Sequence, residues 1–204
     1  MTNKTKKIIW GFGAILGVLG LGWWIYKSVA NMPGVAIADL GRDHKSKEEN
    51  DKFVYNSYPP TSGPHDVDWI KPGVYSLPQD KYKLIHSLEH GYVVVHYNCE
   101  VAMVQSGKGS KWFLVKAHED EGDVDNDSTP SAQIKTDCEL GKILADFGNK
   151  VGMKKFVVTA DESIKFPIVM TAWNRILEMK NFDEKVATDF VNAFRNKGPE
   201  LTME

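Results

Sequence analysis

The chain has 204 residues, enough for one domain with additional segments at about 150 residues per domain. Hydrophobic residues make up 42% and charged residues 25%, which excludes a mainly disordered or collagen-like protein. The net charge is −2, from 25 Lys and Arg against 27 Asp and Glu. Because phosphate contacts require an excess of basic residues, we expect no nucleic-acid partner.

The first expected element is a transmembrane helix over the uncharged run Ile8–Tyr26. At about 1.5 Å per residue this run spans roughly 28 Å, close to the hydrocarbon thickness of a bilayer. Lys4, Lys6 and Lys7 precede it, so we predict a single-pass protein of the cell membrane with a cytoplasmic N-terminus and the rest outside. A signal peptide cleaved after residues 28–30 is the alternative, but its apolar region would be only about 7–15 residues long.

The only two cysteines, Cys99 and Cys138, both fall in the part expected outside the cell, where disulfides persist. A bridge would close about 40 residues and stabilise the fold by at most roughly 4 kcal/mol in the chain-entropy model. We favour this bridge over two free, buried thiols.

We divide the chain into three segments. Residues 1–30 form a cytoplasmic stub and the transmembrane anchor, residues 31–53 a linker, and residues 54–200 an extracytoplasmic domain. The linker contains a Pro-Gly pair and a run of mixed charge with little periodicity.

Periodicity and capping residues predict the elements of the outer domain. Helices are expected at Asp80–His90, Thr136–Lys150 and from Asp183 to about Gly198; strands are expected at Tyr92–Tyr97, Trp112–Val115, Phe156–Thr159 and Ile168–Trp173. Strands interspersed with helices predict an α+β fold, with a small mixed sheet packed against two or three helices.

His86 and His90 lie four residues apart on the first of these helices, so both imidazoles face one side and can share a metal ion. With Glu89 they form His-x-x-Glu-His, the inverzincin pattern, in which the histidines hold zinc and the glutamate activates water. A protease also needs a third ligand and a substrate cleft, so the pattern alone is weak evidence for hydrolysis.

The segment Pro59–His65 has three prolines and a glycine, which stiffen the backbone that carries Ser62 and His65. A stiff backbone lowers the ordering cost of binding a metal through His65. From spacing alone we favour a rigid turn whose histidine only forms hydrogen bonds. Ser62 is not expected to be a nucleophile, because no nucleophile elbow surrounds it.

The acidic segment Glu119–Asp127 alternates carboxylates like the start of a calcium-binding loop. However, Ser128 stands where an EF-hand requires glycine, and Ile134 where it requires glutamate. We therefore expect a solvated acidic loop rather than a calcium site.

These motifs resemble those of bacterial domain-of-unknown-function family 3105. The resemblance rests on Gly41–His44, on Pro59–His65, and on His86–Gly91 followed by Val93–Val95. It extends through Thr171-Ala172-Trp173 and the late helix, and covers about Asp39 to Pro199. The resemblance implies an anchored or exported protein, and it implies no particular reaction.

One departure from the family pattern concerns the cysteines. In similar members they stand a few residues apart, whereas here an insertion at about residues 100–137 separates Cys99 from Cys138. Surface loops tolerate such insertions because closure entropy grows slowly with length. The acidic loop belongs to this insertion, so we assign it no family role.

Because the motifs of the resemblance carry most of the histidines, the resemblance favours a metal site. We predict a site of His65, His86 and His90, with His44 or Glu89 as a further ligand, and zinc or copper as the metal. His96 and His118 are weaker candidates.

We expect a metal-binding protein rather than an enzyme. One alternative is a structural or interaction module of the cell envelope, in which the histidines and Ser62 form a hydrogen-bond network. A less favoured alternative is a metal-dependent hydrolase with Glu89 as base. No protein partner is predicted.

Overall fold

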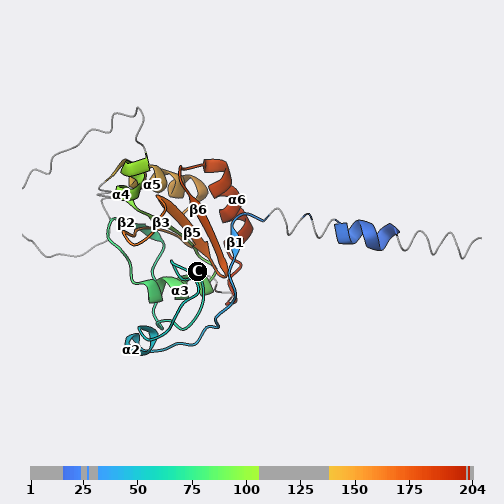
Figure 1. Cartoon of the computed structure of the whole chain (residues 1–204), viewed down its shortest axis with the longest axis horizontal. Coiled ribbons are helices and arrows are strands. Elements are labelled where there is room, and N and C mark those ends of the chain that lie inside the picture. Colours follow the sequence, from blue (N-terminus) through green and yellow to red (C-terminus); the bar gives the residue numbers. More distant parts are fainter. Residues whose placement is uncertain (1–15, 24–26, 28–31, 106–137, 201, 203–204) are drawn as a thin grey trace, which may run out of the picture. The chain divides into compact units, whose positions relative to one another are not determined.

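The structure, a computed structural model, describes residues 16–23, 27, 32–105, 138–200 and 202 (Figure 1). The chain divides into two compact units, Met1–Pro33 and Gly34–Glu204. The predicted strand Trp112–Val115, the acidic loop and His118 lie outside the described residues.

In the first unit, residues 16–23 are helical and exposed. Residues 8–15 and 24–26 of the predicted transmembrane helix lie outside the described residues. Among the described residues, no helix is both long enough and apolar enough to span a membrane. This finding contradicts the predicted transmembrane helix at Ile8–Tyr26, and with it the predicted single-pass topology, membrane partner and cell-membrane localisation.

The second unit contains a mixed six-stranded sheet in the order β1-β6-β5-β3-β4-β2. The strands are β1 Val35–Ala36, β2 Gly73–Tyr75, β3 Val93–Tyr97, β4 Phe156–Ala160, β5 Ile168–Ala172 and β6 Arg175–Met179. Strands β2, β4 and β3 run parallel, while β3–β5, β5–β6 and β6–β1 are antiparallel pairs. The α+β class with a mixed sheet is therefore as predicted.

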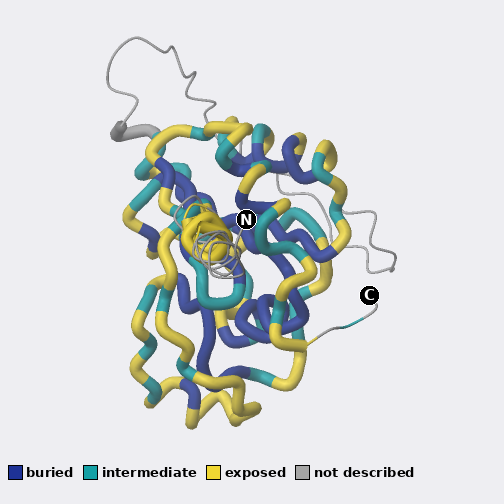
Figure 2. Tube along the Cα trace, turned by 90° about the vertical axis from the view of Figure 1, so that its right-hand side faces the viewer, coloured by how far each residue is buried: buried dark blue, intermediate teal, exposed yellow. Residues whose placement is uncertain are grey.

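The helices of this unit are α2 Lys47–Asn50, α3 Lys81–Glu89, α4 Cys99–Gln105, α5 Glu139–Val151 and α6 Glu184–Phe194. Helices α5 and α6 lie on one side of the sheet and α3 on the other (Figure 1). Figure 2 shows the buried segments of the trace inside an outer layer of exposed turns and loops.

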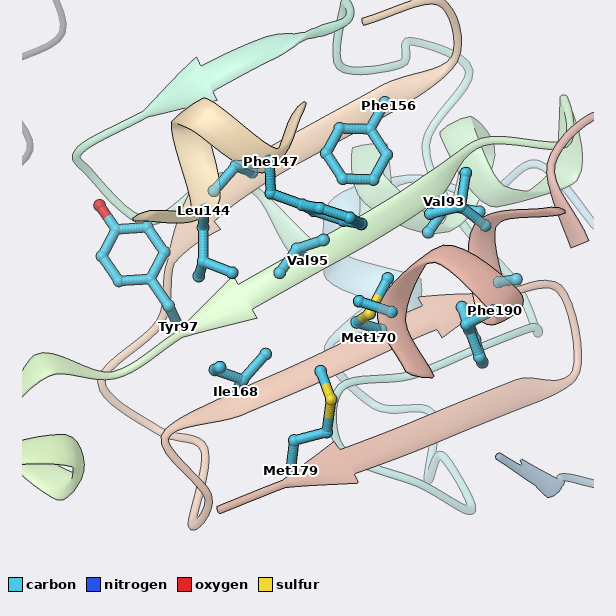
Figure 3. Close-up of a cluster of buried hydrophobic side chains, with 14 residues drawn as sticks. Val93, Val95, Tyr97, Leu144, Phe147, Phe156, Ile168, Met170, Met179 and Phe190 are labelled. Carbon is cyan, nitrogen blue, oxygen red and sulfur yellow. The ribbon is translucent and has the colours of Figure 1, made fainter. Parts of the chain in front are cut away.

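The alternation of side chains along β3 explains these layers. Val93, Val95 and Tyr97 point to one face and pack with Phe147 of α5 and Phe190 of α6 (Figure 3). The intervening Val94 points to the opposite face. A strand with apolar residues on both faces requires a helix layer on each side.

Helix α3 closes the second face of the sheet. Its Leu84 and Leu88 pack with Tyr92, Val94 and Val157. Asp80 caps its start by accepting a hydrogen bond from the Tyr82 N–H at 2.8 Å. The opposite side of α3 faces away from the sheet, and this side carries the histidines.

A disulfide joins Cys99, the first residue of α4, to Cys138, the N-cap of α5. It connects the two ends of the chain segment 100–137. Residues 34–53, expected as a linker, belong to the second unit: β1 pairs with β6, and the Asn50 side chain is fully buried.

Candidate metal centre

Two irregular segments of backbone, residues 40–45 and 61–65, run side by side. The His65 N–H donates to the Asp43 carbonyl at 2.9 Å, and the Lys45 N–H donates to the His65 carbonyl at 2.8 Å. This parallel bridge sets His44 beside His65, with ring centroids 4.9 Å apart. The stiff segment Pro59–His65 thus holds one imidazole in place and aligns a second.

Gly63 is needed for this arrangement. Its φ of +117° lies in the region that glycine favours, and a Cβ would lie 3.0 Å from the Tyr55 ring. Ser62 is buried, and its Oγ accepts a hydrogen bond from the Leu40 N–H at 3.1 Å. Ser62 therefore ties the two segments together and does not lie among the candidate ligands.

Helix α3 supplies the other side chains of the site. His86, Glu89 and His90 are spaced three and four residues apart, so they share one face of the helix. The side chains of His65 and Glu89 are buried, and the His44 side chain is 43% exposed. The site is therefore enclosed on the inner side and reachable from solvent at His44.

Four of these residues converge. One ligand atom each from His44, His65, His86 and Glu89 lies within 4.8 Å of the others. Glu89 Oε2 is 3.0 Å from His65 Nε2 and 3.7 Å from His44 Nε2. Ligands of a tetrahedral ion with bonds of about 2.1 Å lie roughly 3.4 Å apart, which falls between these two separations.

Backbone carbonyls define the tautomers of two of the histidines. His65 Nδ1 lies 2.8 Å from the Gly63 carbonyl oxygen, and His86 Nδ1 lies 2.8 Å from that of Asp66. A carbonyl oxygen only accepts hydrogen bonds, so each Nδ1 carries a proton. When the ring is neutral, its lone pair is then on Nε2, as in most metal-bound histidines.

The protonation equilibrium of His86 favours the form that binds metals. Burial is the largest effect and lowers the pKa of His86 below its usual 6.5, and the neighbouring imidazoles lower it further. The hydrogen bond to the Asp66 carbonyl opposes these effects without reversing them. His86 is therefore neutral at pH 7, and its lone pair is on Nε2.

The contact between His65 and Glu89 requires a proton or a metal ion between the two side chains. With its Nδ1 proton directed to Gly63, a neutral His65 presents the Nε2 lone pair to a carboxylate oxygen 3.0 Å away. Two lone pairs at this distance repel, so either a proton or a metal ion must lie between them. Arg42, 3.9 Å from the other oxygen and largely exposed, compensates little of the buried charge.

His90 lies in an adjacent group. Its Nε2 is 3.0 Å from His86 Nε2 and 3.8 Å from Glu200 Oε2, and these three residues form a second set of potential ligands. The predicted ligands His65, His86 and His90 thus occupy two neighbouring groups, with His86 common to both. His44 and Glu89, each predicted as a further ligand, both belong to the first group.

Sequence reasoning missed Glu200 and Trp69. Glu200 lies in the C-terminal tail, the segment that follows α6, and its carboxylate approaches His90. No local pattern in the sequence predicts it as a ligand. The Trp69 ring packs against His86 and His90, with centroid separations of 5.7 and 5.1 Å.

His96, a weaker candidate in the sequence, points elsewhere. From β3 it contacts Thr171 Oγ1 at 3.3 Å and Asp161 Oδ2 at 3.4 Å. It belongs to neither ligand group among the described residues.

The sequence model of one protein family, described as Protein of unknown function (DUF3105), matches residues 46–111 and 131–204. No curated protein and no solved structure matches the chain. The matched ranges include His65, His86, Glu89, His90 and Glu200, whereas His44 lies just before the first range. Since the matched ranges together cover more than half of the chain, this protein belongs to the DUF3105 family, whose function is unknown.

Proposed function

We propose that this protein binds a transition-metal ion, zinc or copper(II), through Nε2 of His44, His65 and His86 and the carboxylate of Glu89. The observation that carries the proposal is the 3.0 Å contact between His65 Nε2 and Glu89 Oε2, with the Nδ1 proton of His65 directed to a backbone carbonyl. A metal ion between these atoms removes the repulsion and binds a neutral imidazole in its usual ligating tautomer.

The chemistry of the donors supports zinc or copper(II). Three imidazole nitrogens and one carboxylate oxygen suit these ions better than magnesium or calcium, which prefer oxygen ligands. Both cysteines are joined in the disulfide, so no thiolate is available to favour copper(I).

The placement of Glu89 favours binding over hydrolysis. A catalytic base in a zinc hydrolase stands beside the metal-bound water and is not itself a ligand. Here Glu89 Oε2 lies within the group of ligand atoms, close to both His44 and His65. Exposure of His44 leaves a route by which the ion can enter or leave.

A hydrogen-bond network is the competing function for the same residues. If a proton takes the place of the metal, His65 donates to both Gly63 and Glu89, and the cluster only stabilises the fold. Measurement of bound metal separates the two.

The test uses the full chain, dialysed against Zn²⁺ or Cu²⁺ and then against buffer, with bound metal measured by elemental mass spectrometry. We expect at least one equivalent of metal in the unaltered protein and affinity at least tenfold lower in Glu89→Gln, because the charged ligand is lost. Glu178→Gln, the same change at an exposed carboxylate of β6, should bind like the unaltered protein.

Absence of bound metal in the unaltered protein would overturn the proposal. So would a Glu89→Gln variant that is less stable but retains full metal affinity. His44→Gln provides a second check, because this side chain is exposed and its replacement leaves the buried contacts intact.

A further inference from the structure

We infer that the site takes a second divalent transition-metal ion, held by Nε2 of His86 and His90 and the carboxylate of Glu200, so that the centre is dinuclear. This inference rests on the proposed function, because the first ion occupies the neighbouring group.

The two imidazoles of α3 already have the separation of ligands on one ion. His86 Nε2 and His90 Nε2 are 3.0 Å apart, with their rings nearly perpendicular at 85°. Ligands at right angles on an ion with bonds of about 2.1 Å lie about 3.0 Å apart. Without metal, the lone pair on His86 Nε2 can only accept a hydrogen bond from the Nε2–H of His90. A bound ion takes the place of the proton in this hydrogen bond.

His86 has one lone pair and can serve only one ion at a time, because its Nδ1 proton is directed to the Asp66 carbonyl. With two ions present, the six side chains divide evenly. His44, His65 and Glu89 hold the first ion, and His86, His90 and Glu200 hold the second. Each ion then has two histidines and one carboxylate, a ligand set that leaves coordination positions open.

Glu200 is positioned by backbone contacts of the tail. The Asn196 N–H donates to the Gly91 carbonyl at 2.8 Å, and the Glu200 N–H donates to the Glu89 carbonyl at 3.1 Å. The buried Lys155 ammonium donates hydrogen bonds to the carbonyls of His90 and Thr202, at 2.9 and 2.8 Å. The tail is thus attached to the C-terminal end of α3 on both sides of Glu200.

Gly198 permits this close approach. A Cβ at this position would lie 2.1 Å from the Glu89 carbonyl oxygen and 2.3 Å from the Gly91 nitrogen, closer than real atoms allow. The tail therefore rests directly on the backbone of α3, and the Glu200 carboxylate reaches His90 Nε2 to within 3.8 Å.

The two groups of potential ligands are close enough to form one metal centre. The His86 ligand atom lies within 4.8 Å of those of His44, His65 and Glu89. Two-metal centres in proteins hold their ions about 3.5–4 Å apart, and the ions act together on a bound oxygen ligand.

The experiment counts zinc ions per full chain by native mass spectrometry during titration with Zn²⁺. We expect two ions in the unaltered protein and one in Glu200→Gln, which replaces a half-exposed carboxylate and leaves the fold intact. Gly198→Ala should also retain one ion, because it displaces the tail without touching a ligand. Glu178→Gln should retain two.

A single ion in both the unaltered protein and Glu200→Gln would overturn the second site and leave the proposed function standing. Loss of both ions in Glu200→Gln would also overturn it, because the two groups would then not be separable. No ion in the unaltered protein would instead overturn the proposed function itself.

Discussion

At the scale of single residues, the position of one proton decides whether a histidine can bind a metal. The Gly63 and Asp66 carbonyls each hold an Nδ1 proton, and so direct the Nε2 lone pairs of His65 and His86 into the site. The sequence predicted the residue types and the shared helix face. It could not predict the tautomers, because the two carbonyls belong to a loop without regular periodicity.

Asp161 is a second residue whose ionisation depends on its neighbours. Burial is the largest single effect and raises the pKa of its carboxyl, but the contact with the His96 imidazole and the hydrogen bonds from the Ser163 N–H and Tyr58 together bring the pKa below 3.8. The carboxylate therefore stabilises the fold at pH values above about 3.8, and this contribution is lost as the pH falls through the folded-state pKa.

We predict that Asp161→Asn lowers the free energy of unfolding by about 2 kcal/mol at pH 7, as expected for loss of hydrogen bonds to a charged group. The difference from the unaltered protein should shrink below about pH 4. Denaturant unfolding across this pH range measures it, with Asp146→Asn, an exposed position on α5, as control. A difference that stays constant with pH would contradict the prediction.

At the scale of elements, α3 has two functions. One side packs against the sheet through Leu84 and Leu88, and the other presents the histidines and Glu89. Leu88 is 1% exposed and also lines a cavity of about 180 Å³ between α3 and the sheet. Packing of the apolar side therefore supports the position of the ligand side.

Leu88→Ala should lower the free energy of unfolding by about 3 kcal/mol, because it removes buried apolar contacts and enlarges this cavity. Leu77→Ala, at a side chain that is 69% exposed, should change it by less than about 0.5 kcal/mol. Equal effects of the two variants in chemical denaturation would show that α3 is not packed as described.

The sequence located the longer elements. The β-branched runs predicted β3, β4 and β5, and helical periodicity predicted α3 and α6, the latter with Asp183 as its cap. It missed β1 and β2, which have two and three residues, too few for a period to be visible. It also missed β6, where Arg175 and Glu178 interrupt the apolar pattern.

At the scale of the whole molecule, the disulfide joins the ends of a long chain segment. The cysteines are separated by 39 positions, and the closed loop lowers the entropy of the unfolded chain. We predict that Cys99→Ala/Cys138→Ala lowers the free energy of unfolding by about 3 kcal/mol.

Adding a reductant to the unaltered protein should produce a similar loss of stability and should leave the double variant unchanged. Thermal unfolding with and without dithiothreitol measures both. Insensitivity of the unaltered protein to complete reduction would contradict this account of the disulfide.

The predicted membrane anchor is the main error at this scale. An uncharged run is a property of composition, whereas spanning a bilayer also requires a continuous helix of sufficient length. Among the described residues no helix meets both requirements.

The sequence by itself determined the residue types of the site, the family motifs and the α+β class, because these depend on local patterns along the chain. Only the tertiary structure decided which atoms meet. His65 and Glu89 are 24 positions apart, and Glu200 approaches His90 from the far end of the chain. These contacts between residues distant in the sequence arise because separate segments pack against α3, and no local periodicity predicts them.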